Sequence, residues 1–180
     1  SSTINSYVFQ NEAIVNRKGH IHMEAVYSKD EQGAYQTLKI IIEQDVATVF
    51  KLLSTTEGIQ QWFPQLSFED RQVGGKMKFQ MDGQDDEEME ITAFEENETI
   101  GYTWDIGTVR FDLHDTGKET VLIFDECLPF AFPHIILDFA GWQFQMENIK
   151  QVAETGSSID QQALVFDSKK QEIAEKLNLK

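Results

Sequence analysis

The longest uninterrupted helical pattern in the chain runs from His134 to Gly156. Apolar residues recur there at steps of three and four, as one face of an α-helix requires, at Ile135, Phe139, Trp142, Met146, Ile149 and Ala153. Much of the opposite side is polar, with Glu147, Asn148, Lys150, Gln151 and Glu154. Pro133 suits the first turn, and Gly156 can end the helix in the left-handed conformation. Such a helix is about 27–30 Å long, enough to lie across a small sheet.

The stretch after Pro64 changes from a helical to an alternating hydrophobic period and keeps it for about sixty residues. This alternation predicts an antiparallel meander of six strands, with apolar positions at Leu66 and Phe68; Met77, Phe79 and Met81; Met89, Ile91 and Ala93; Ile100, Tyr102 and Trp104; Val109, Phe111 and Leu113; and a last strand from Thr120 to Asp125. The acidic run at 85–88 is interpreted as a solvated turn. One face of such a sheet needs cover, which the long helix can supply.

A strand and two short helices are predicted before the meander. The strand starts at Gln36 and has its buried face at Leu38, Ile40 and Ile42. Asp45 can cap the first helix, whose apolar positions are Val46, Val49, Phe50 and Leu53. Thr55 or Thr56 can cap the second, with an apolar face of Ile59, Trp62 and Phe63 that ends at Pro64.

The two ends of the chain have weaker patterns. Residues 1–35 are interpreted as an amino-terminal extension, in which Ala13–Asn16 and His20–Tyr27 flank a turn at Arg17-Lys18-Gly19 and form a short hairpin. The main domain spans 36–156. Residues 157–180 form a polar tail or a short peripheral helix, with Ile173 and Leu177 as its helically spaced apolar pair.

Charge and composition exclude several classes of function. The formal net charge is −16, from 31 acidic and 15 basic residues, so the chain repels phosphate backbones and is not expected to bind nucleic acid. A single cysteine and the lack of an apolar leader in the sequence favour a cytoplasmic protein. No stretch approaches the roughly 20 apolar residues of a membrane span, so membrane insertion is not expected.

Four short motifs, in this order and spacing, resemble a known family: Gln61-Trp62-Phe63, Val73-Gly74-Gly75, Tyr102-Thr103-Trp104 and Ala140-Gly141-Trp142. Between Gln36 and Gly156 the chain resembles the START-like (SRPBCC) superfamily, in its branch homologous to the carboxy-terminal domain of the activator of heat shock protein 90 ATPase. The resemblance implies an α+β helix-grip fold of the Bet v type, in which a curved antiparallel sheet wraps around the long carboxy-terminal helix. It also implies an apolar cavity between the two in many members, and no single reaction for the family.

Aromatic residues and methionines on the predicted sheet and long helix can line such a cavity or simply fill the core. The ligand-binding candidates are Phe79, Met89, Tyr102, Trp104, Phe111, His114, Phe139, Trp142, Gln143 and Met146. Tyr102, His114 and Gln143 are the expected internal polar anchors. Trp142 is expected to point inward because it shares the apolar stripe of the helix.

No catalytic, metal or cofactor site is predicted. Cys127 follows Asp125 and Glu126, whose charges would raise the pKa of its thiol, so it is interpreted as structural. His20 and His22 have a spacing that two metal ligands could use, but no cysteine or acid stands at a recognisable ligand spacing. They are interpreted as surface histidines.

Three functions remain open. The first is a non-enzymatic protein that binds a small hydrophobic or aromatic ligand between sheet and helix. The second, implied by the resemblance, is a chaperone-associated module that binds other proteins. The third is an enzyme of the cyclase or aromatase type, which needs an internal acid–base pair that the sequence does not reveal.

Overall fold

The computed structural model describes residues 10–15, 21–159 and 166–177. The described strands form one antiparallel sheet in the order β1-β2-β3-β9-β8-β7-β6-β5-β4. The strands are β1 (Gln10–Val15), β2 (Ile21–Lys29), β3 (Gly33–Ile42), β4 (Leu66–Phe68), β5 (Lys76–Phe79), β6 (Glu87–Glu95), β7 (Thr99–Trp104), β8 (Gly107–Asp115) and β9 (Thr120–Pro129). The helices are α1 (Val46–Ser54), α2 (Thr56–Ile59), α3 (Ile135–Thr155) and α4 (Phe166–Leu177).

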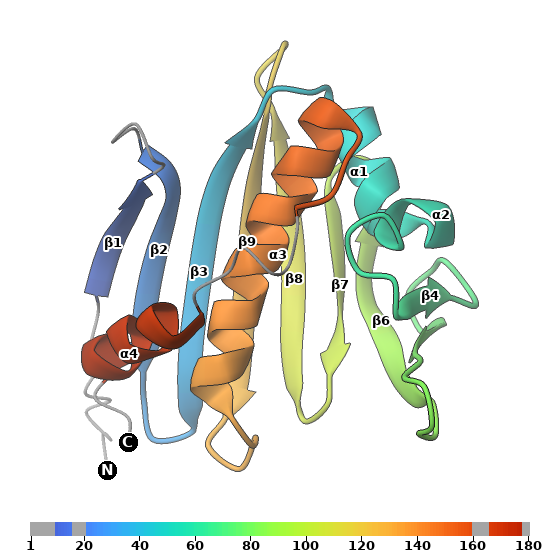
Figure 1. Ribbon diagram of the computed structural model, residues 1–180. Coiled ribbons are helices and arrows are strands. Elements are labelled where there is room, and N and C mark those ends of the chain that lie inside the picture. The colour runs from blue at the N-terminus through green and yellow to red at the C-terminus, as the bar shows by residue number, and fades with distance from the viewer. Residues whose placement is uncertain (1–9, 16–20, 160–165, 178–180) are drawn as a thin grey trace, which may run out of the picture.

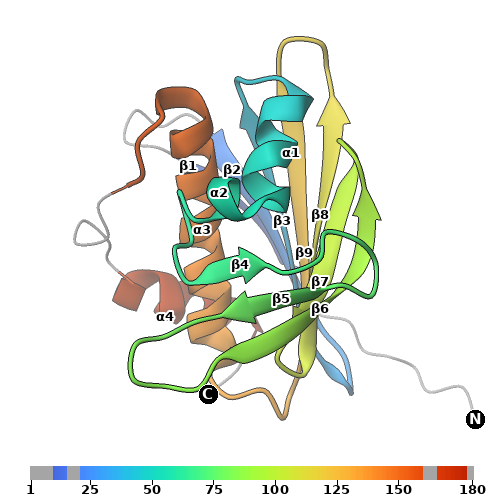
Figure 2. The same ribbon diagram turned by 90° about the vertical axis from the view of Figure 1, so that its right-hand side faces the viewer.

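The helix α3 lies along one face of this sheet (Figure 1). Seen from the side, the helices lie on that face and the strands β4 to β6 bend toward it (Figure 2). All the apolar positions predicted to form the stripe of α3 are buried. The predicted α+β helix-grip architecture is therefore confirmed, because period-2 strands bury one face and a period-3.6 stripe covers it.

The carboxy-terminal end of α3 agrees with the sequence signal, whereas Pro133 lies before the N-cap His134 and not in the first turn as predicted. Gly156 ends the helix with a φ of 80°, and its N–H donates to the carbonyl of Val152. Asn148 was expected on the solvent side, yet it is buried. Its Nδ2 donates to the carbonyl of Trp62, and its Oδ1 accepts from the N–H of Ile159. The segment after α3 folds back over the helix, so the expectation for Asn148 is wrong.

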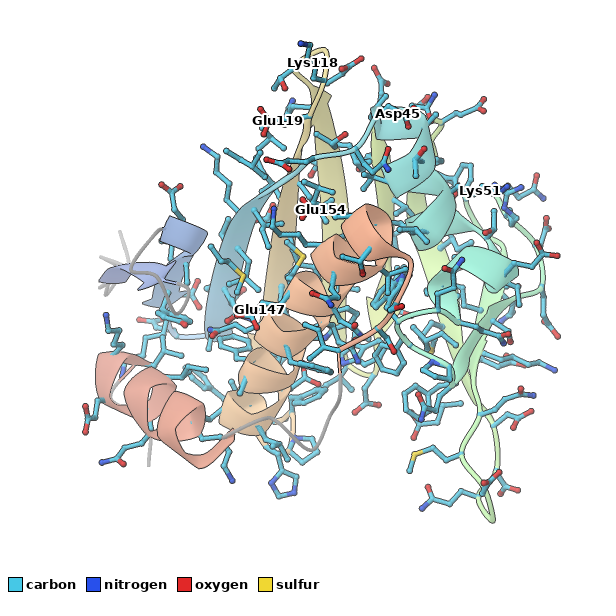
Figure 3. All side chains as sticks on the ribbon, turned by 45° about the horizontal axis from the view of Figure 1, so that its top comes forward. Asp45, Lys51, Lys118, Glu119, Glu147 and Glu154 are labelled. Carbon is cyan, nitrogen blue, oxygen red and sulfur yellow. The ribbon has the colours of Figure 1, made fainter. Side chains whose placement is uncertain are left out.

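The predicted caps hold α1 and α2. Asp45 Oδ1 accepts the N–H of Thr48 at 2.8 Å, and Figure 3 shows Asp45 at the start of α1. Thr55 Oγ1 accepts the N–H of Gly58 at 2.9 Å. The helix α2 ends at Ile59, earlier than predicted, so Trp62 and Phe63 lie in the turn that follows.

The meander has the predicted six strands, with different limits for three of them. Met81 lies beyond the end of β5 and is 47% exposed, so its place in the alternation is wrong. The strand β6 begins at Glu87, inside the run interpreted as a turn. The strand β9 continues to Pro129, because it pairs with β3 along its whole length.

The first two described strands and the last described helix extend the same layers. The described parts of the segments proposed to form a hairpin lie in β1 and β2, which pair antiparallel, while the predicted turn at 17–19 and its neighbours Asn16 and His20 lie outside the described residues. The helix α4 packs on α3 and β2 and buries both Ile173 and Leu177. None of the described helices is long and apolar enough to cross a membrane.

Candidate functional site

The space between α3 and the middle of the sheet is filled by aromatic side chains around Trp142, which is 2% exposed. Its ring stacks on Phe124, with centroids 4.7 Å apart, and meets Trp104 edge-on at 5.0 Å. The rings of Trp62, Phe63 and Phe111 also lie within 6.3 Å of it. The prediction that Trp142 points inward is confirmed, and the centre of the grip is packed core.

A hollow opens beside this cluster at the amino-terminal part of α3. Its volume is about 380 Å³, within the range of small-molecule sites. Its walls are mainly aromatic and apolar, and the lining residues are Phe63, Trp104, Phe132, Pro133, His134, Leu137, Asp138, Gly141, Trp142 and Gln145. A Cβ placed on Gly141 would meet no atom within 4 Å beyond its own helix backbone and chain neighbours. The missing side chain at Gly141 therefore leaves part of this space open.

The predicted ligand-binding residues divide into three groups. Trp104 and Trp142 line the hollow, and Phe79 lies behind its wall, with its ring 6.0 Å from Trp104. Most of the others are buried elsewhere in the core, at Met89, Tyr102, Phe111, Phe139, Gln143 and Met146. His114 is exposed, because Phe111 and Leu113 of the same strand take the inward positions. The expectation that His114 is an internal anchor is wrong.

Sequence reasoning missed a buried polar cluster between β3, β9 and α3. Gln36 Nε2 donates to Glu126 Oε1 at 3.3 Å and to the carbonyl of Phe139 at 3.2 Å. Gln143 Nε2 donates to Gln36 Oε1 at 2.9 Å and to the hydroxyl of Tyr27. Gln36 and Glu126 are cross-strand partners and are at most 2% exposed. The available signal was their parity, since each lies on the same face of its strand as the apolar core residues two positions away.

The cluster continues through Glu126 to Asp138, which lines the hollow. Burial raises the pKa of Glu126 well above its usual range, and a hydrogen bond to Asp138 and the negative charge of that residue raise it further. These effects favour the protonated form of Glu126. Trp104 Nε1 donates to Asp138 Oδ2 at 2.9 Å. Asp138 thus connects the buried polar cluster to the indole of Trp104.

Two further polar atoms near the hollow are buried without a hydrogen-bond partner among the described residues: the Tyr102 hydroxyl and Gln145 Oε1. Burial, and then the charge of Glu126, raises the pKa of Tyr102 above its usual range, so this hydroxyl stays neutral. Gln145 lines the hollow, whereas Tyr102 is not among its lining residues. Of the two, Gln145 is the group that a bound molecule could meet.

Cys127 has the character of a structural residue. Burial raises the pKa of its thiol, with Asp30 as a second cause, so the thiolate is disfavoured. The two acids predicted as causes, Asp125 and Glu126, are not among those that raise the pKa of Cys127; Asp125 shares the outer face of β9 with it and accepts from Thr37 Oγ1 at 2.6 Å. Within the described residues, no group of three His, Cys, Asp or Glu side chains could hold a metal ion. His20 and the side chain of His22 lie outside them.

Comparison with known proteins agrees with this geometry. The family model described as "Activator of Hsp90 ATPase homolog 1-like protein" matches residues 43–154. This range runs from the end of β3 to the end of α3 and includes all the residues that line the hollow. No curated protein matches the chain.

Several solved structures share the fold. The conserved protein of unknown function EF2215 from Enterococcus faecalis is 30% identical, with a TM-score of 0.80 over 87% of this chain and 92% of its own. The Aha1 dimer from Colwellia psychrerythraea is 18% identical, with a TM-score of 0.58 over 67% of this chain and 96% of its own. CalU16 from Micromonospora echinospora is 14% identical, with a TM-score of 0.61 over 98% of this chain and 97% of its own.

Proposed function

The chain belongs to the activator of Hsp90 ATPase homolog 1-like family, and we propose that it binds a small, flat hydrophobic or aromatic molecule in the hollow beside α3. The observation that carries the proposal is the combination of aromatic walls with a buried, unpartnered amide acceptor. Phe63, Trp104 and Trp142 offer apolar surface, and Gln145 Oε1 offers a hydrogen-bond acceptor. Sites for small molecules have this composition, with many apolar contacts and few polar ones.

The polar anchor is Gln145 instead of the residues expected from the sequence. Gln143 already donates to Gln36 and Tyr27, and Tyr102 is not among the residues that line the hollow. A phenol, amine or amide N–H would give Gln145 Oε1 the donor that it lacks. With one anchor of this kind, we expect micromolar affinity, about −8 kcal/mol.

The test uses fluorescence and thermal unfolding with a panel of aromatic and lipid-like compounds. A ligand in the hollow contacts Trp104 and Trp142, so it should quench tryptophan fluorescence and raise the melting temperature as its concentration rises. In a Gly141→Leu variant the new side chain fills the hollow, and both effects should disappear. Gln151→Leu, at an exposed position of the same helix, is the matched control and should bind as the parent does.

Protein binding is the second candidate, and an exposed apolar surface favours it. Phe130 and Leu137 are 43% and 47% exposed and line a second hollow of about 640 Å³ between α3 and α4. If this surface docks on a heat shock protein 90 chaperone, a Phe130→Ser, Leu137→Ser double variant should lose the association in a sedimentation experiment. Absence of association with the parent protein would contradict this second function.

A further inference from the structure

The charge of the buried carboxyl pair identifies the class of ligand for the hollow. Each carboxyl has one oxygen with a neutral donor: Asp138 Oδ2 accepts from Trp104 Nε1, and Glu126 Oε1 accepts from Gln36 Nε2. The other two oxygens, Asp138 Oδ1 and Glu126 Oε2, are buried and have no donor in the described part of the chain. A single proton between these two oxygens satisfies both. The pair then keeps one negative charge.

That charge lies mainly on Asp138. Glu126 is 2% exposed and lies behind the hollow on β9, whereas Asp138 is only partly buried and forms part of the wall. An ionised carboxylate costs less free energy at the partly exposed position, where the indole N–H also donates to it. The hollow therefore has an anionic group in a wall that is otherwise mostly aromatic.

In the part of the chain that the structure describes, no Lys or Arg side chain neutralises this wall from within the hollow. Its lining includes no Lys or Arg among the described residues, and its other titratable side chain, His134, is exposed at the rim. The groups behind Asp138, Glu126 from β9 and Tyr102 from β7, are neutral when protonated. The formal net charge of −16 adds a field that favours positive ligands.

The aromatic walls suit the same kind of ligand. The faces of indole and phenyl rings attract cations, and ammonium groups are recognised in proteins by several such rings together. Trp104 and Trp142 meet edge-on with centroids 5.0 Å apart, and Phe63 lies within 5.9 Å of both. Phe132 completes the set of rings that line the hollow.

From these contacts we propose that the ligand is an organic cation, an amine with an aromatic or hydrophobic body. The body lies against Trp104 and Trp142, and the ammonium group pairs with Asp138. Glu126 acts as a positioning residue, which holds the Asp138 carboxylate through its proton. This inference rests on the proposed function, since it names the ligand class for the same hollow.

The experiment compares two probes that differ in one group. Tryptamine carries an ammonium group at neutral pH, and tryptophol carries a neutral hydroxyl on the same indole body. Calorimetric titration of the full chain at pH 7 should show tryptamine binding roughly tenfold more tightly than tryptophol. The preference should shrink as salt is added, because it depends on a charge at the protein surface.

Two isosteric variants locate the charge. Asp138→Asn keeps an acceptor for Trp104 but removes the charge, so tryptamine should lose its advantage while tryptophol binds as before. Glu126→Gln keeps a neutral donor toward Asp138 and should retain the preference. Melting curves show whether each variant is folded.

The outcomes separate the two proposals. If tryptophol binds as tightly as tryptamine, or if Asp138→Asn retains the full preference, the cation inference is wrong and the binding function stands. Loss of the preference in a folded Glu126→Gln variant would also contradict it, because the charge would then lie on Glu126. If neither probe binds, both proposals are wrong.

Discussion

Trp142 joins the two layers of the molecule at a single position. Its ring packs on Phe124 and Phe111 of the sheet, and Trp104 and Phe63 flank it at the hollow. The same ring therefore belongs both to the core and to the wall of the candidate site. A substitution at Trp142 affects stability and binding together, so neither effect can be read from this residue alone.

Replacing Trp142 with alanine should lower the free energy of unfolding by about 3–5 kcal/mol, the usual cost for a buried aromatic side chain. Chemical denaturation followed by circular dichroism measures this directly. Phe130→Ala, at an exposed aromatic position, is the control and should change the midpoint little. An unchanged midpoint for Trp142→Ala would contradict the packing.

Glu126 should make stability depend on pH. The pKa of Glu126 in the folded protein lies above the ordinary value of 4.5, which applies to the unfolded chain. At a pH between the unfolded and the folded pKa, the unfolded chain has released a proton that the folded chain keeps. Stability from this group is fully present below pH 4.5 and falls as the pH rises, by up to about 1.4 kcal/mol per pH unit. Glu126→Gln removes the titration. The difference in unfolding free energy between variant and parent should therefore increase from pH 5 to 7 in favour of the variant, and a constant difference would contradict it.

At the scale of the element, α3 has a weak point where it forms the hollow. Gly141 lies inside the helix, where glycine costs about 1 kcal/mol relative to alanine, and no neighbouring element occupies the place of its side chain. The strands β7 and β9 provide the rest of the framework, with Trp104 and Glu126 on positions fixed by their alternation. The sheet and α3 thus surround an open space at residue 141, where helix propensity alone would favour a residue with a side chain.

Gly141→Ala should raise the free energy of unfolding by about 0.5–1 kcal/mol, because it adds helix propensity without a steric clash. The hollow should become narrower, so affinity for aromatic ligands should fall. The matched control is Gly156→Ala at the end of the same helix, where φ is 80° and an alanine is strained. In thermal unfolding, the melting temperature should rise for Gly141→Ala and fall for Gly156→Ala. Shifts of the melting temperature in the same direction would contradict this account.

At the scale of the whole molecule, side chains fill the space between the centre of the sheet and α3. The hollow opens only beside the amino-terminal part of α3. Figure 3 shows charged side chains around the sheet and α3, with Lys118 and Glu119 at the tip of the β8–β9 hairpin and Glu154 on α3. Glu154 accepts from Lys150 Nζ at 2.7 Å and from the N–H of Glu43. Acidic residues outnumber basic ones by 31 to 15, so the summed field is negative.

This field should prevent binding of nucleic acids. With a net charge of −16, few cationic side chains can replace the counterions of a phosphate backbone. Titration of fluorescent DNA and RNA oligomers at low salt, where electrostatic binding is strongest, should give no change in anisotropy. Tight binding that weakens with salt would overturn the expectation.

The architecture could be predicted because its signals are local. A stripe at steps of three and four makes α3 an amphipathic helix, Asp45 and Thr55 cap the helices that they precede, and alternation sets which residues of each strand face inward. Local signals did not predict where a strand or helix ends when its end depends on contacts with a remote segment. The strand β9 continues past Asp125 because β3 supplies partners as far as Gly33, and α2 stops where the chain turns toward β4.

The candidate site depended on contacts that no local pattern contains. Alternation placed Trp104, Phe111 and Met89 on the inner face, but only packing decided that Trp104 borders a hollow while the other two lie in the core. Gln36 meets Gln143 across 107 positions of sequence, and Glu126 meets Asp138 only because β9 and α3 lie against each other. The sequence by itself determined which face each side chain takes, since backbone period does that. The tertiary structure decided which faces meet, because the distance between remote residues depends on how the layers bend and cross.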